Sequence, residues 1–362
     1  MHRSILLLGV ALSAIVSTHA QPSSAAAILA AGDQAWAELV ALNTVPTVLK
    51  IRQGDDLTTT DAKAKITRQA DQSLVVSKRA HDFYSQFPGH SKAAEARKIE
   101  AITSLRAVTD GDTAQEQSAL TIAGLVRDSR SAPSSDRFEV ALSIERLKYT
   151  KQLKSKTARG TSAERVQIGE DLRKEFGDQP GLQKYYLEIA RHADTDTASG
   201  LATSIVRSAA ASAADKAEAQ SILNRAALIG KPLNVRVAKP DGREIDLGQQ
   251  QNKITAVIVW SPADPGNAEA LRAVEKTIPS GIQVVYVAVG GTSQQLASAQ
   301  NRVLGVAGDS YVSTGAAAKS LTAALQLQKA PVPFVYVINR AGKVVACGRL
   351  RELPALLSKA IG

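Results

Sequence analysis

Two places in the 362-residue sequence hold side chains whose types could support chemistry. The first is the tetrapeptide Asp264-Pro265-Gly266-Asn267, which follows a run of β-branched residues and precedes a helical pattern. A carboxylate at the start of a helix would meet unpaired N–H groups and the positive end of the helix dipole. The second is Cys347, which is the one cysteine of the chain and therefore its one candidate for thiol chemistry.

The elements expected to position the tetrapeptide are readable from the sequence. Residues 254–260 are mostly β-branched and end in Trp260, which predicts a buried parallel strand, and residues 268–277 follow the helical period. Asp264 can cap that helix, and Pro265 suits its first turn because proline lacks only an N–H that is unpaired there. Open α/β sheets place their binding sites at such strand-to-helix turns, so we expect the functional site here.

This stretch resembles the active-site segment of the periplasmic thioredoxin-like proteins related to TlpA and of the redoxin group. Those proteins carry Trp, three residues and then Cys-x-x-Cys at the helix start, frequently with Pro between the cysteines. Here Trp260 and Pro265 match, whereas Asp264 and Asn267 stand at the positions of the two cysteines. The resemblance implies a thioredoxin-like fold with a degenerate active site at residues 264–267, because a carboxylate and an amide cannot exchange disulfides.

The resemblance extends over residues 230–362. Alternating apolar residues around a turn at 240–243 predict a hairpin, as in the lead-in to the family's fold, and residues 282–289 predict a further buried strand. Pro333 matches the family's cis-proline, which faces the Cys-x-x-Cys motif. The resemblance implies that Val332, Pro333 and Trp260 could bind an extended peptide, with Val332 pairing through its backbone. The alternative, that Pro333 only maintains the fold, remains open.

Residues 28–229 show the period of amphipathic helices and predict an all-α domain, so the fold class expected for the chain is α+β. Phe87-Pro88-Gly89 and Phe176-Gly177 end helices in the same manner, which resembles the helical hairpins of tetratricopeptide-like repeats. No clean period is present, so a repeat array and an irregular bundle are both compatible with the pattern. Two capping-box patterns, Thr161 with Glu164 and Ser212 with Asp215, predict helix starts.

Residues 1–20 have the pattern of a signal peptide. A basic start precedes an apolar run that is short for a membrane span, and Thr18-His19-Ala20 offers a cleavage site. We therefore expect cleavage near Ala20 and a periplasmic or secreted protein, with an uncleaved anchor as the alternative. No later segment is long and apolar enough to predict a membrane span.

Charge and composition limit the classes of binding partner that we expect. The net charge is +10, and the chain from Lys231 onward is the basic half, yet it has no run of basic residues and few aromatics to stack bases. Nucleic acid is therefore not expected, and an acidic partner or a solvated basic face fits better. The histidines at positions 81, 90 and 192 lack metal-ligand spacing and are expected at the surface. No metal or cofactor is predicted, and the sequence does not indicate an oligomeric state.

Two functions remain after these exclusions. The first is a non-catalytic adaptor that binds an envelope protein or an extended peptide through a helical region at 28–229 and a thioredoxin-like domain at 230–362. The second is a thiol-disulfide oxidoreductase or peroxidase-type redoxin that acts through Cys347 or through a thiol supplied by a partner. Cys347 lies in an apolar strand pattern, where a small buried thiol is the usual interpretation. The loss of Cys-x-x-Cys favours the adaptor.

Overall fold

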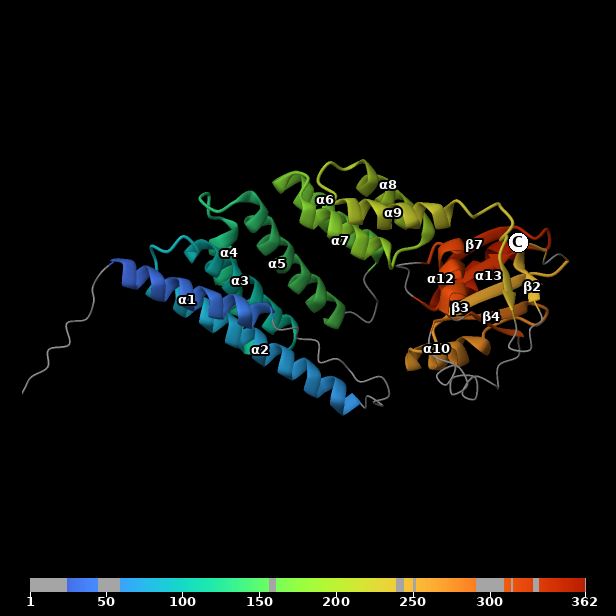
Figure 1. Ribbon diagram of the computed structural model, residues 1–362, viewed down its shortest axis with the longest axis horizontal. Coiled ribbons are helices and arrows are strands. Elements are labelled where there is room, and N and C mark those ends of the chain that lie inside the picture. The colour runs from blue at the N-terminus through green and yellow to red at the C-terminus, as the bar shows by residue number, and fades with distance from the viewer. Residues whose placement is uncertain are drawn as a thin grey trace, which may run out of the picture.

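A computed structural model describes residues 25–44, 59–155, 161–238, 244–249, 252–290, 309–313, 315–327 and 332–361. Helices make up the amino-terminal part of the described chain, and a mixed sheet with covering helices makes up the carboxy-terminal part (Figure 1). The predicted signal peptide at 1–20 and the predicted turn at 240–243 lie outside the described residues.

The amino-terminal helices pack as successive hairpins. Their bounds are α1 Ala25–Thr44, α2 Thr59–Gln86, α3 Ala93–Thr109, α4 Glu116–Arg127, α5 Ser134–Ser155, α6 Ser162–Phe176, α7 Pro180–Ala190, α8 Thr195–Arg207 and α9 Ala213–Ala226. From α2 onward each hairpin packs against the next, because α3, α5 and α7 also contact the helices that follow their own hairpin. None of the described helices is both long and apolar enough to cross a membrane.

Both predicted capping boxes are present. The Thr161 hydroxyl accepts from the backbone N–H of Glu164 at 3.3 Å, and the Glu164 carboxylate accepts from the N–H of Thr161 at 3.1 Å. Ser212 and Asp215 form the same reciprocal pair at the start of α9. Each box satisfies two N–H groups that the helix itself leaves unpaired, so these side chains decide where α6 and α9 begin.

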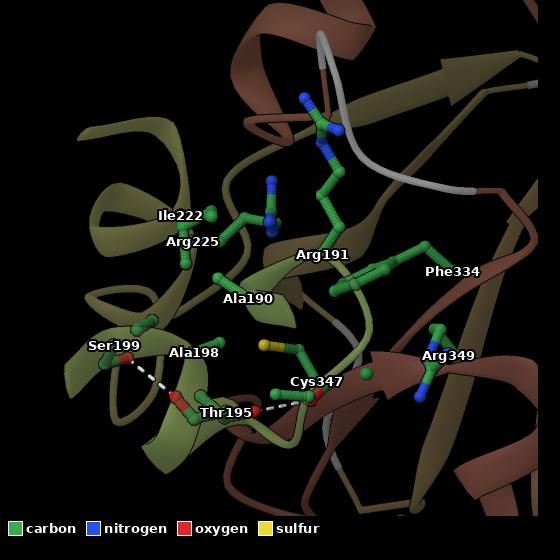
Figure 2. A pocket seen from close by; sticks show the side chains of 13 residues that line it. Ala190, Arg191, Thr195, Ala198, Ser199, Ile222, Arg225, Phe334, Cys347 and Arg349 are labelled. Carbon is green, nitrogen blue, oxygen red and sulfur yellow. Dashed lines mark hydrogen bonds between the residues drawn. The ribbon is translucent and has the colours of Figure 1, made fainter. Parts of the chain in front are cut away.

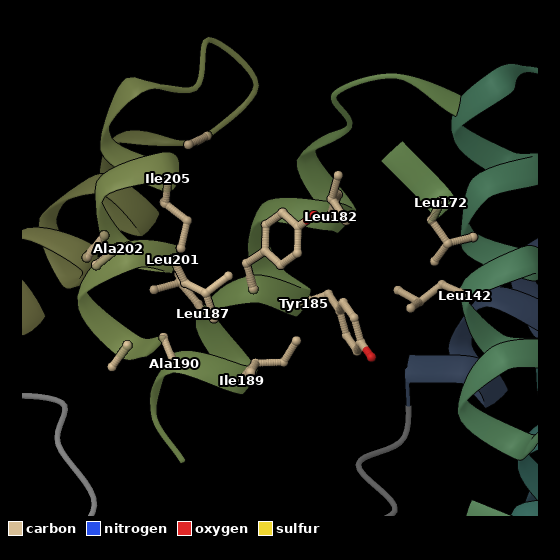
Figure 3. Close-up of a cluster of buried hydrophobic side chains, with 14 of the residues drawn as sticks. Leu142, Leu172, Leu182, Tyr185, Leu187, Ile189, Ala190, Leu201, Ala202 and Ile205 are labelled. Atoms are coloured by element: carbon tan, nitrogen blue, oxygen red, sulfur yellow. The ribbon is translucent and has the colours of Figure 1, made fainter. Parts of the chain in front are cut away.

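The hairpins form a stack with unequal repeats. The second helices of the hairpins begin at Ala93, Ser134, Pro180 and Ala213, so the interval differs from one hairpin to the next. A continuous apolar core runs from α5 to α9 (Figure 3). This core supplies the burial that an isolated helical hairpin lacks, which is how stacked repeats are stabilised.

The sheet has the strand order of a thioredoxin-like fold. Its elements and the helices around it are β3 Thr255–Trp260, α10 Pro265–Glu275, β4 Gln283–Val289, β5 Asp309–Ser313, α12 Gly315–Ala324, β6 Phe334–Ile338, β7 Val344–Arg349 and α13 Leu353–Ile361. The order is β5-β4-β3-β6-β7, with β3, β4 and β5 parallel and β6 and β7 antiparallel to their neighbours. The predicted α+β class, with a helical first part and a thioredoxin-like second part, is confirmed.

The two faces of the sheet are covered differently. On β3, Ile258 and Trp260 face a core completed by α10 and α13, whereas Val257 and Val259 face a core completed by α12 and a separate hairpin. That hairpin consists of β1 Arg236–Ala238 and β2 Glu244–Asp246. All six residues of β3 are buried, as the β-branched run predicts for a strand covered on both faces.

One strand has no signal in the sequence, and one expectation needs correction. Residues 309–313 pair with β4 as β5, because pairing with a buried neighbour overrides their polar composition. His90 was expected at the surface, but only 4 % of its side chain is exposed. The ring packs edge-on against Phe83, bonds Asp33 at 3.2 Å and fits because Gly32 has no Cβ.

Candidate functional site

The turn between β3 and α10 is closed by its own polar side chains. The Asp264 carboxylate caps α10, accepting from the N–H of Gly266 at 3.0 Å. The amide nitrogen of Asn267 donates to the second oxygen of the same carboxylate at 2.7 Å. The two side chains flanking Pro265 and Gly266 are therefore joined by a hydrogen bond, at the spacing where a Cys-x-x-Cys motif would place two sulfur atoms.

Asn267 is the buried centre of this turn. Its side chain is only 3 % exposed, and its amide oxygen accepts from the N–H of Ser261 at 3.1 Å. Because that N–H can only donate, its bond identifies which end of the amide is oxygen. Asn267 thus ties the end of β3 to the start of α10, whereas Asp264 is exposed and meets solvent.

Pro333 lies beside this turn. The Val332–Pro333 peptide bond is cis, and β6 begins directly afterwards with Phe334 opposite Val259. The antiparallel register therefore places Pro333 next to the end of β3, where Trp260 is 3 % exposed. Of the described residues, none forms a backbone hydrogen bond with Val332. The candidate binding residues Trp260, Val332 and Pro333 share one end of the sheet with residues 264–267.

Cys347 does not belong to this group. It lies on β7 opposite Tyr336, in the core beneath α12, whereas Trp260 lies in the core on the other face of the sheet. The thiol is 3 % exposed. Burial raises the pKa of the Cys347 thiol above its ordinary value, and the opposing effects of Arg225 and Thr195 do not reverse that shift. The thiol is therefore protonated at neutral pH and is a poor nucleophile.

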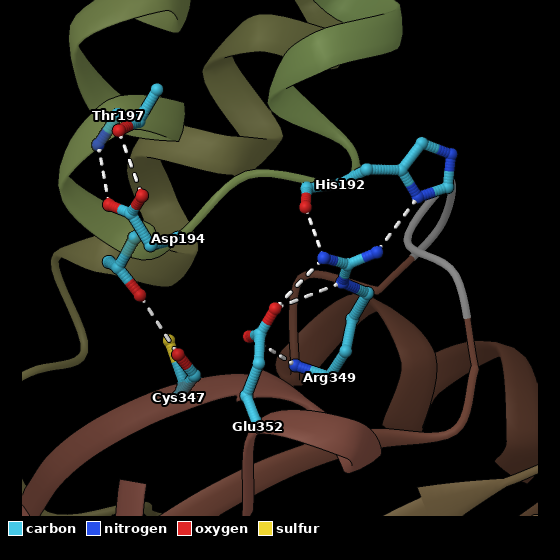
Figure 4. A network of polar contacts seen from close by, with 7 residues as sticks. His192, Asp194, Thr197, Cys347, Arg349 and Glu352 are labelled. Atoms are coloured by element: carbon cyan, nitrogen blue, oxygen red, sulfur yellow. Dashed lines mark hydrogen bonds and ion pairs between the residues drawn. The ribbon is translucent and has the colours of Figure 1, made fainter. Parts of the chain in front are cut away.

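The helical part covers the outer edge of β7, which sequence analysis did not predict. The Thr195 hydroxyl, at the start of α8, donates to the carbonyl oxygen of Cys347 at 2.8 Å. Arg349 donates to Nδ1 of His192 at 3.3 Å and also to the His192 carbonyl (Figure 4). Glu352 holds the same guanidinium with an Nη2–Oε1 distance of 2.9 Å. These contacts satisfy polar groups that an exposed strand edge would leave open.

The last helix of the stack, α9, holds the chain on both sides of the segment that carries Pro333. Ser221 and Arg225 donate to the carbonyl oxygen of Gln326 at 3.1 and 2.7 Å. Gln326 has a φ of 54°, a left-handed conformation that costs energy for a residue with a Cβ. Beyond Pro333, the Arg225 guanidinium lies over the Phe334 ring, 5.3 Å from its centroid. No local sequence pattern signals these contacts, because the partners are about a hundred residues apart.

The described residues contain no group of three or more His, Cys, Asp or Glu side chains able to hold a metal ion. His192 lies among guanidinium groups, and His90 has Asp33 as its one carboxylate partner in the described chain. The turn at 264–267 offers one exposed carboxylate, already engaged by two hydrogen bonds.

No family model matches the chain, and the comparison with curated proteins finds no similar sequence. Solved thioredoxin-fold structures match its carboxy-terminal part. The thioredoxin domain of a thiol-disulfide oxidoreductase from Bacteroides vulgatus is 14 % identical, with 37 % of this chain and 98 % of that chain covered and a TM-score of 0.31. A secreted Mycobacterium tuberculosis disulfide oxidoreductase, homologous to E. coli DsbE, is 16 % identical over 35 % of this chain and 96 % of that chain, with a TM-score of 0.28. Identities this low transfer no activity.

Replacing Asn267 with alanine should destabilise the protein. The change leaves the N–H of Ser261 and one oxygen of Asp264 without their protein partner, and a lost buried hydrogen-bond partner costs about 1–3 kcal/mol. Denaturant unfolding of Asn267→Ala should show this loss. Glu269→Ala, at an exposed position of the same helix, is the matched control and should change stability by less than about 0.5 kcal/mol. Equal stabilities for the two variants would contradict the bridging role of the amide.

The contact between His192 and Arg349 should weaken in acid. Partial burial first, then the guanidinium groups of Arg349, Arg165 and Arg351, hold the pKa of His192 below its usual range, although Glu188 opposes the shift. The neutral ring accepts from Arg349, so its stabilising effect is complete above the unfolded pKa of about 6.5 and is lost as the pH falls towards the lower folded pKa. As the pH is lowered from about 7.5 to 5, the midpoint temperature of thermal unfolding should therefore fall more steeply in the wild type than in His192→Asn. Parallel profiles would refute this role.

Proposed function

We propose that the chain is an exported protein whose thioredoxin-like domain binds a protein or extended peptide without redox catalysis. The observation that carries this proposal is the hydrogen bond between Asp264 and Asn267. On this proposal, Asp264 and Asn267 stand where the thioredoxin-like family has two cysteines. A carboxylate and an amide cannot be oxidised and reduced as a pair of thiols can. On this reading the chain is a TlpA-like or redoxin-type protein with a degenerate site.

The proposed peptide site lies at the ends of β3 and β6, around the cis bond that precedes Pro333. The cis Val332–Pro333 bond stands beside the end of β3, and the backbone of Val332 forms no hydrogen bond among the described residues. An extended peptide could pair with the backbone of Val332, just before β6 begins, and these main-chain hydrogen bonds would give affinity. Trp260 is only 3 % exposed and packs beneath this site from the core.

The helical stack supplies the second half of the adaptor. Hairpin arrays of this kind present extended surfaces to protein partners, and here the last hairpin is joined to the sheet by side chains from α8 and α9. An envelope protein is the partner we propose, because the first twenty residues have the pattern of a signal peptide.

The competing function is a thiol enzyme that uses Cys347. The pKa of Cys347 is raised by burial, and its side chain faces a different core from Trp260, so nothing in the described geometry favours a thiolate at the 264–267 turn. A mixed disulfide with a partner thiol would require that β7 first become accessible. The adaptor is therefore the function we favour.

Peptide binding tests the proposal directly. Fluorescently labelled extended peptides are titrated into the mature protein, and Pro333→Ala should weaken the tightest complex by at least about ten-fold, since each 1.4 kcal/mol lost is ten-fold in affinity. Pro279→Ala, at an exposed proline before β4, is the control and should bind as the wild type does. Cys347→Ser should also bind normally, and an insulin reduction assay should show no activity. Loss of binding in Cys347→Ser, or turnover in the assay, would favour the thiol enzyme instead.

A further inference from the structure

The junction between the helical stack and the sheet contains a small, partly open cavity. It has a volume of about 30 Å³ and is lined in part by Thr195, Ser199, Arg225, Phe334 and Cys347. Arg225 enters it from α9 and the Cys347 sulfur enters it from β7 (Figure 2). A cavity needs roughly 10–15 Å³ of such space to hold one water molecule, so this one has room for about two water-sized atoms.

Arg225 forms no ion pair with a carboxylate of the described chain, although the charge of Glu218 attracts it from a greater distance. Arg225 is only 8 % exposed. Its guanidinium donates to the Gln326 carbonyl and lies over the Phe334 ring, and both of these partners are uncharged. Burial lowers the pKa of Arg225, which means that desolvation of the cation is not fully offset. A buried cation normally has a counter-charge, because a low-dielectric interior solvates it poorly.

The other charged groups of the junction are already engaged. Arg191 pairs with Glu218 at 2.6 Å, and Arg349 pairs with Glu352 at 2.9 Å. The Cys347 thiol is protonated and carries no charge, since burial raises its pKa. Among the described residues around this cavity, three guanidinium groups therefore share two carboxylates, and Arg225 is the one that has no carboxylate within ion-pair distance.

From this geometry we infer that the cavity is a site for a small monovalent anion, either a halide ion or a small carboxylate, held by the guanidinium group of Arg225. The hydroxyl groups of Thr195 and Ser199 line the cavity, but they donate their protons to the carbonyl oxygens of Cys347 and Thr195. The anion neutralises the cation that holds Gln326 and Phe334, the residues on either side of the Pro333 segment. Occupancy of the site therefore stabilises the attachment of α9 to the sheet.

Chloride is the first probe. The full mature protein is exchanged into gluconate, whose anion is too large for the cavity, and chloride is added at constant ionic strength while the chlorine NMR linewidth is followed. Excess broadening that formate displaces is expected in the wild type and in Arg207→Gln, which removes an exposed arginine from α8. Arg225→Gln should abolish the broadening. A wild type without excess broadening holds only water in the cavity, and that result overturns the inference.

Cys347 gives a second readout that needs no variant. Because its thiol lines the cavity, a bound anion should slow its labelling by an aromatic disulfide, by about ten-fold at a concentration ten times the dissociation constant. The half-saturation concentrations from labelling and from the linewidth should agree. Line broadening that survives in a folded Arg225→Gln variant would place the anion elsewhere and contradict the inference. Labelling of the wild type that is insensitive to chloride would also contradict it, and this second result does not require that Arg225→Gln folds.

Discussion

The hydrogen bond between the amide of Asn267 and the carboxylate of Asp264 determines what the turn after β3 can do. It closes the turn at 2.7 Å and leaves the amide oxygen for the N–H of Ser261, so that β3 and α10 are joined through one buried side chain. A disulfide at the same spacing would be a reversible link whose breakage performs chemistry. A hydrogen-bonded pair has no comparable reaction, and this difference is why we propose that this end of the sheet binds a partner without catalysis.

The second organising feature is the cover over β7. Strand edges expose unpaired backbone groups, and here Thr195, Gly230 and Lys231 bond to Cys347 and Val344 along that edge. The same contact buries the one thiol of the chain and brings α9 against both sides of the Pro333 segment. Loss of the helical stack would thus expose the edge, the thiol and the cavity at Arg225 together. The helices and the proposed peptide edge are parts of one physical arrangement.

Much of the local structure could be predicted because its causes are local. The β-branched run before Trp260 predicted the buried strand, Asp264 and Pro265 predicted the helix start, and the pairs Thr161–Glu164 and Ser212–Asp215 predicted capping boxes. These signals act within a few residues. The resemblance to thioredoxin-like proteins then supplied the fold class of residues 230–362 and the cis conformation before Pro333, which no local pattern specifies.

What could not be predicted depends on contacts between distant residues. β5 is a strand because β4 lies beside it, and Asn267 is buried because the sheet and α10 close over it. The contacts of His192 with Arg349 and of Arg225 with Gln326 join residues more than a hundred positions apart. Amino-acid composition and hydrophobic periodicity do not predict such contacts. The cavity at Arg225 is therefore a property of the folded junction alone.

The most direct test of the central claim restores the sulfur. In the double variant Asp264→Cys with Asn267→Cys, the new thiols replace side chains that now touch, and a disulfide requires Cα atoms within about 4.4–6.8 Å. After mild oxidation and unfolding, thiol titration should find only Cys347 free, with no dimer present. If all the cysteines remain reduced, or if the new ones react only between molecules, residues 264–267 do not occupy the geometry of a thioredoxin-like redox site and the account is wrong.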